Sequence, residues 1–95
     1  MALVEMDFAL GGGTREVQNI TVSLTGNTWV DTGIKSNDAY LISLEVVSMY
    51  ATFAKDTSDN WNVIFGGYFA IQVNASGNIE IKMTTYSGSA NIYYV

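Results

Sequence analysis

Cysteine, histidine and proline are all absent from this chain of 95 residues. The lack of cysteine excludes disulfide bonds, and the lack of both cysteine and histidine excludes most zinc sites. Without an imidazole or a thiol there is no ordinary catalytic triad, and the carboxylates fall mostly in turns beside Ser, Thr and Asn. We therefore expect no enzymatic activity, no catalytic residues and no cofactor. The absence of proline leaves every strand free to take a central place in a sheet.

Charge is also scarce, since charged residues make up 14% of the chain and about 25% of an average protein. The net charge is -5, and the four cations Arg15, Lys35, Lys55 and Lys82 are scattered. No basic stripe is available for a phosphate backbone or an anionic lipid surface. No apolar run approaches the roughly 20 residues of a membrane-spanning helix, and the N-terminus lacks a secretory signal pattern. We expect neither nucleic acid nor membrane as a partner.

Apolar residues, in contrast, are plentiful, at 48% of the chain with 13% aromatic. A chain this short buries only about 60–65% of its unfolded surface on folding, so a monomer is marginally stable. Disulfides and most zinc sites are excluded, which leaves oligomerisation as the common remaining way to bury more surface. We therefore expect a homo-oligomer.

From residue 16 onward the pattern is that of β-strands. Apolar residues alternate with polar ones over residues 20–25 and 40–47, and the second of these segments is apolar on both faces in places, as in a central strand or one that touches a partner. Turn residues at 26–27, 36–38, 55–60, 66–67, 75–78 and 87–89 separate about seven or eight short strands. This spacing predicts an all-β fold, an antiparallel β-sandwich of the jelly-roll or a related Greek-key type, over residues 15–95.

The first 14 residues differ from the rest. Apolar residues precede three consecutive glycines, Gly11 to Gly13, which are costly to order in a regular element. One interpretation is a docking peptide followed by a glycine hinge, and the other is a first strand followed by a loose loop. In the first interpretation the residues that contact a partner are Leu3, Val4, Met6, Phe8 and Leu10.

Two tryptophans are candidates for ligand binding, because an aromatic ring can stack on the apolar face of a sugar. Trp61 follows the polar loop that contains Asp59 and Asn60, and Asn62 comes next; Trp29 stands near Asn27 and Asp31. Aromatic residues also fill sandwich cores, an interpretation that we favour for Trp29 and weigh equally for Trp61. The oxygen-rich loop at residues 56–60 does not match the calcium loop of an EF-hand, so we expect no metal site there.

Three segments resemble small β-domains of bacteriophage virion proteins, especially fibre tips and head or tail appendages. They are residues 4–14 (VEMDFALGGGT), 22–34 (VSLTGNTWVDTGI) and 77–95 (GNIEIKMTTYSGSANIYYV). The resemblance implies a structural protein, often a trimer, that docks through its N-terminal peptide onto a capsid or tail protein. It would be made in the cytoplasm of a host bacterium and located in the virion. No functional residue carries over, because such proteins share no signature site.

Three functions remain open at this point. The first is a structural virion component, either a fibre tip or a decoration domain. The second is a carbohydrate-binding adhesin module that recognises a host-surface glycan through Trp61 and its loop. The third is a small oligomeric interaction protein of a cell, with no virus involved.

Overall fold

In the computed structural model, which describes residues 5–8 and 13–95 and the side chains from residue 16 onward, strands succeed one another along almost the whole chain. A single 3-10 turn, η1 (Ser36–Asp38), interrupts them within this described part. The strands are β1 (Glu5–Phe8), β2 (Gly13–Glu16), β3 (Gln18–Leu24), β4 (Val30–Lys35), β5 (Leu41–Val46), β6 (Met49–Lys55), β7 (Trp61–Gly66), β8 (Phe69–Val73), β9 (Asn78–Met83) and β10 (Gly88–Tyr94).

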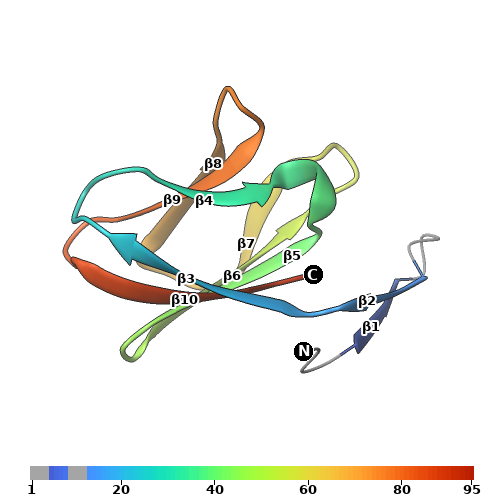
Figure 1. Cartoon of the computed structure of the whole chain (residues 1–95), viewed down its shortest axis with the longest axis horizontal. Coiled ribbons are helices and arrows are strands. Elements are labelled where there is room, and N and C mark those ends of the chain that lie inside the picture. The colour runs from blue at the N-terminus through green and yellow to red at the C-terminus, as the bar shows by residue number, and fades with distance from the viewer. Residues whose placement is uncertain (1–4, 9–12) are drawn as a thin grey trace.

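Eight of these strands form two antiparallel sheets that face each other (Figure 1). The larger sheet has the order β3-β10-β5-β6-β7, and the smaller has the order β4-β9-β8. Strands β5, β6 and β7 follow one another as hairpins, and β10 returns to lie beside β5, which is the connection of a Greek key. The predicted fold class, an all-β antiparallel sandwich, is confirmed.

The core lies between the two sheets because alternate residues of the inner strands point inward. The pairing of Ile92 with Ile20 and with Leu44 carries one such row across three neighbouring strands. Strand β5, which is apolar on both faces in the sequence, occupies the predicted central position between β10 and β6. The largest fully buried side chains are Ile42, Leu44, Val46, Ile79, Ile81 and Ile92.

A tight turn separates β5 from β6. Val47 has a φ of 53° and Ser48 completes the turn, so the chain reverses there. Further along, β9 ends at Met83. The following bend contains Tyr86, which packs against the core from outside the strands.

The N-terminal segment forms a small hairpin of its own, in which β1 pairs with β2 from Glu5 opposite Glu16 to Phe8 opposite Gly13. Figure 1 shows this hairpin at one end of the molecule, where β2 runs on into β3. The predicted boundary between residues 14 and 15 therefore falls inside β2. The expected docking residues are not described: Leu3, Val4 and Leu10 lie outside the described residues, as do the side chains of Met6 and Phe8.

Candidate functional site

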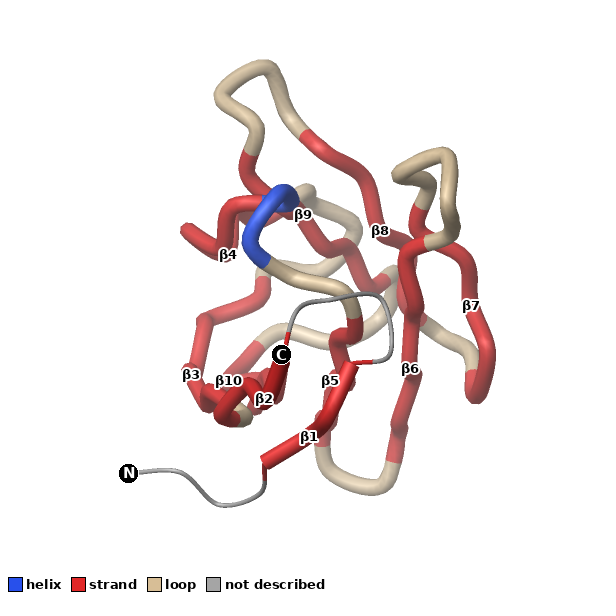
Figure 2. Tube along the Cα trace, turned by 90° about the vertical axis from the view of Figure 1, so that its right-hand side faces the viewer, coloured by secondary structure: helices blue, strands red, loops and turns tan. Residues whose placement is uncertain are grey.

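Strand β7 is the least protected part of the sandwich. It ends the five-stranded sheet, and among the residues that the structure describes only β6 lies beside it there, so the backbone groups along its other edge have no described strand to pair with (Figure 2). None of its residues is buried. Three consecutive large apolar side chains stand on it, with exposed fractions of 56% for Val63, 61% for Ile64 and 65% for Phe65.

Both faces of β7 contribute to this apolar surface. Val63 pairs with the buried Phe53, so it points to the inner side of the sheet, and it is nevertheless exposed. The three-stranded sheet therefore does not cover β7 at this position. Phe65 pairs with Thr52 and points outward, while Ile64 lies at the shift of register between these two pairs. We call Val63, Ile64 and Phe65, together with the unpaired edge of their strand, the β7 edge.

The chain segment that contains the β7 edge carries no charge. Residues 61–73 (WNVIFGGYFAIQV) contain no acidic or basic side chain. Within this segment Tyr68 is 70% exposed, and Val73 of the edge strand β8 is also exposed. Natural sheets commonly protect an edge with lysine, proline or a bulge. Of these three devices, β7 has only the shift of register.

A hollow of about 380 Å³ brings together three of the predicted ligand-binding residues, Asp59, Asn60 and Trp61. Its opposite wall is formed by β8 through Ile71, Gln72 and Val73. The Trp61 indole is half-buried against the core, and its N–H donates a hydrogen bond to the Ser36 hydroxyl at 3.0 Å. This ring is therefore held by the fold and has one side towards the hollow.

The loop before Trp61 is organised around Asp56. Its carboxylate accepts hydrogen bonds from the backbone N–H groups of Ser58 (2.8 Å) and Asn60 (3.0 Å) and from the Asn62 amide (2.9 Å). The bond from Asn60, followed by those from Asn62 and Ser58, lowers the pKa of Asp56 below its ordinary value. Asn62, predicted to bind a ligand, is thus occupied in closing the loop.

Trp29 lies apart from this hollow. It is half-buried, and the Lys82 ammonium group stands 4.9 Å from its ring centroid, a cation–π contact. It is not among the residues packed into or against the core. The structure does not bring Trp29 and Trp61 into one site.

A second carboxylate, that of Asp31 in β4, connects this strand to the turn between β8 and β9. It accepts hydrogen bonds from the Gly33 N–H (2.7 Å), the Asn74 amide (2.8 Å) and the Asn78 amide (3.1 Å). These bonds, in that order of effect, lower the pKa of Asp31. Asp31 and Asp56 therefore stabilise turns as carboxylates.

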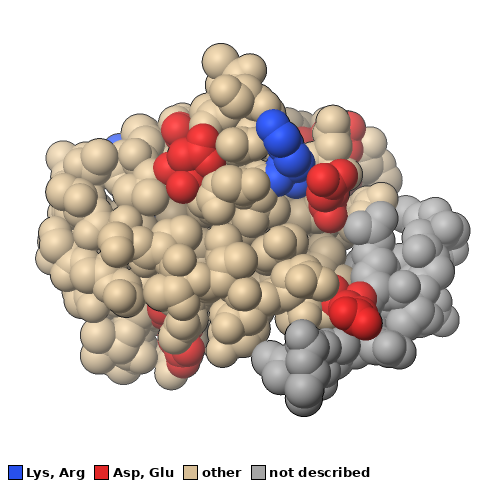
Figure 3. Space-filling model, in the orientation of Figure 1, with Lys and Arg blue, Asp and Glu red and all other residues tan. Residues whose placement is uncertain are grey.

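Charged side chains elsewhere are dispersed. In the view of Figure 3 they occupy small separate patches, and most of the face is uncharged. The three cations with described side chains are all engaged: Lys35 donates to the Ser76 carbonyl, Lys55 donates to the Ser36 carbonyl, and Lys82 covers Trp29. Within the described part of the chain, no group of three acidic, histidine or cysteine side chains is placed to hold a metal ion. The same residues include no helix of a length and apolarity that would cross a membrane.

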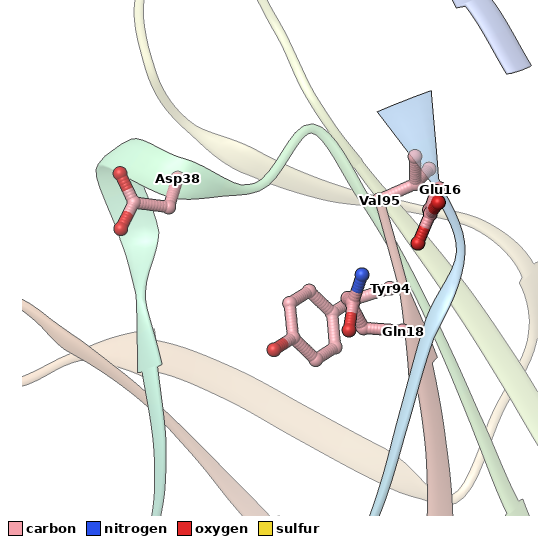
Figure 4. Close-up of a pocket in the computed structure, with 5 residues that line it drawn as sticks. All are labelled: Glu16, Gln18, Asp38, Tyr94 and Val95. Carbon is pink, nitrogen blue, oxygen red and sulfur yellow. The ribbon is translucent and has the colours of Figure 1, made fainter. Parts of the chain in front are cut away.

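Near the start of the sandwich, Glu16, Gln18, Tyr94 and Val95 meet Asp38 of η1 around a hollow of about 350 Å³. Figure 4 shows the two carboxylates at opposite sides, with the Tyr94 ring and Gln18 between them. Two acidic groups without a cation in the lining make this a poor site for an anion. Tyr94 also packs against the core, which accounts for its orientation.

A further hollow, of about 340 Å³, lies on the outer face of the five-stranded sheet. Sequence reasoning did not find it, because its residues come from β5, β6, β7 and β10. The row that crosses it places Tyr93 beside Ser43, Ser43 beside Thr52, and Thr52 beside Phe65. The one sequence signal for this hollow is the pair Tyr93 and Tyr94, because adjacent residues of a strand face opposite sides of the sheet. Tyr93 is the one that faces outward. We call this the outer-face hollow.

Comparison with family models, with curated proteins and with solved structures finds no match to this chain.

Proposed function

We propose that this chain is a non-enzymatic assembly domain, and that copies of it associate through the β7 edge. The observation that carries the proposal is the exposure of Val63 on the inner side of β7, next to an unpaired strand edge. This inward-facing valine is 56% exposed, so the smaller sheet leaves most of its side chain uncovered. A strand from a second copy would pair with the free backbone groups and cover this side chain.

The charge pattern supports a second copy as the occupant. Two chains of net charge -5 repel each other on average, but residues 61–73 bring no charge to the contact. Antiparallel pairing of β7 with β7 of another copy is isologous and closes as a dimer. The trimer predicted from the resemblance would need β7 of each copy to meet a different strand of the next copy.

The virion setting is supported by the resemblance of residues 4–14, 22–34 and 77–95 to phage fibre-tip and appendage domains. In this proposal the N-terminal hairpin attaches the domain to a capsid or tail protein, and the sandwich projects from it. Deleting residues 1–13 should leave cooperative unfolding of the sandwich intact and abolish incorporation into particles. Genes for capsid or tail proteins beside its own gene would support this setting, and their absence would favour a small oligomeric interaction protein of a cell.

The assembly proposal is tested by sedimentation equilibrium of the full chain at micromolar concentrations. We expect a multiple of the 10.3 kDa mass for the wild type and the single mass for Ile64→Lys, because a lysine on an edge strand opposes strand pairing. Val47→Lys is the matched control, since Val47 is 74% exposed at the tip of the β5–β6 hairpin. A monomeric wild type, or an Ile64→Lys variant that keeps its oligomeric mass, would contradict the proposal.

A further inference from the structure

We propose that the outer-face hollow binds a neutral pyranose sugar, as part of an oligosaccharide. The inference does not rest on the proposed assembly. Strand pairing along the β7 edge adds strands in the plane of the sheet, so it leaves this face open. The site also differs from the Trp61 hollow, which lies between the edges of the two sheets.

The hollow results from a contrast of side-chain size along one row of the sheet. Tyr93 and Phe65 stand at the two ends of this row, three strand spacings or about 14 Å apart. Between them are the short side chains of Ser43 and Thr52. Two aromatic walls and a floor of hydroxyl groups therefore enclose an open space of about 340 Å³.

The polar groups of the hollow suit the hydroxyls of a sugar. The Ser43 and Thr52 hydroxyls lie 3.0 Å apart and share one hydrogen bond, which leaves one donor and several acceptor positions for a ligand. In the next row Glu45 pairs with Tyr50. The Glu45 carboxylate is half-buried and makes no hydrogen bond to any residue that the structure describes, nor does the Tyr50 hydroxyl.

These features select the class of ligand. A pyranose ring presents an apolar face to an aromatic ring and hydroxyls around its rim, and it therefore matches both kinds of lining group. An extended peptide would gain little, because the backbone groups of the central strands are already paired within the sheet. A sialylated or phosphorylated ligand would meet Glu45 and a domain of net charge -5. The lining favours a neutral sugar over an acidic one.

The test begins with an array of neutral oligosaccharides and their sialylated counterparts, probed with the full chain. The best neutral glycan is then titrated in solution by calorimetry, so that avidity does not enter the measured affinity. We expect Tyr93→Ala to weaken binding about tenfold or more, which corresponds to the loss of one ring contact. Tyr50→Ala should weaken binding to a similar degree, because Tyr50 lines the hollow and offers its hydroxyl to the ligand. Tyr68→Ala is the matched control, because Tyr68 is exposed outside the hollow, and its affinity should equal that of the wild type.

Several results would overturn the inference. They are an array without a bound neutral glycan, stronger binding of the sialylated forms, and unchanged affinity in both Tyr93→Ala and Tyr50→Ala. Loss of binding in Trp61→Phe alone would place the sugar in the other hollow instead. Ile64→Lys separates this inference from the proposed assembly: the variant should titrate with the wild-type affinity whether or not its mass changes. Thermal unfolding of each variant verifies that it is folded.

Discussion

Replacing Trp61 with alanine distinguishes a structural ring from a ligand platform. The Trp61 indole packs against the core and its N–H donates to Ser36 Oγ at 3.0 Å. Loss of this hydrogen bond costs about 1 kcal/mol. Loss of the half-buried aromatic surface costs about 2 kcal/mol more. We therefore expect Trp61→Ala to lower the free energy of unfolding by about 3 kcal/mol.

The assay is urea denaturation followed by far-UV circular dichroism, with the fluorescence of the remaining Trp29 as a second probe. For a domain of this size the same loss lowers the melting temperature by roughly 12 to 24 °C. Trp61→Phe keeps most of the packing and loses the N–H donor, so its cost should be about 1 kcal/mol.

A double-mutant cycle with Ser36→Ala isolates the contact. The coupling between Trp61→Phe and Ser36→Ala should be about 1 kcal/mol, because each single variant already removes the same hydrogen bond. A loss below about 1 kcal/mol in Trp61→Ala, or additive single variants, would refute a structural role for this ring. The ring would then be available for a ligand, as the sequence alone allows.

Two further predictions concern polar groups that hold turns and strands together. Thr32→Val should lower the free energy of unfolding, measured by urea denaturation, by about 2–3 kcal/mol, because the buried Thr32 hydroxyl donates to the Ile79 carbonyl and accepts from the Ile34 N–H. The control Thr32→Ser keeps both hydrogen bonds and should cost about 1 kcal/mol. Equal losses in the two variants would contradict the prediction. The pKa values of Asp31 and Asp56 are lower in the folded state than their ordinary value of 3.8, so their contribution to stability is complete above that pH and is lost as the pH falls through the folded values. Melting temperatures between pH 6 and 2 should therefore fall below pH 4, and Asp31→Asn should show a smaller fall; an equal fall in this variant would contradict the role of Asp31.

Local patterns predict the strands of this domain well. The alternation of apolar and polar residues over 40–47 places Ile42, Leu44 and Val46 on one face, and all three are buried. The sequence does not predict that β10 inserts between β3 and β5. The pairing of β10 with β3 joins residues about 70 positions apart in the sequence. The alternation of apolar and polar residues that defines each strand contains no information on which strands lie beside it.

The candidate sites show the same limit. Asp59, Asn60 and Trp61 are adjacent in the sequence, and the structure indeed places them around one hollow. The outer-face hollow combines residues 43–45, 50–52, 65 and 93, whose proximity depends on the strand order. The apolar run in β7 does not reveal from the sequence whether the strand is buried or exposed. Consecutive apolar residues are typical of a strand buried on both faces, but an uncovered strand such as β7 can have the same pattern.

The β7 edge and the outer-face hollow lie on the same sheet, and the two proposals are geometrically compatible. Antiparallel pairing of β7 with its copy requires a twofold axis perpendicular to the sheet, since the two strands must continue one hydrogen-bonded layer. This axis keeps the outer faces of both copies on the same side. Phe65 ends the row of the hollow on the strand next to the axis. The dimer would therefore present two sugar hollows side by side on a continuous sheet, and a surface that carries many copies of a glycan would bind both at once, more tightly than one domain alone.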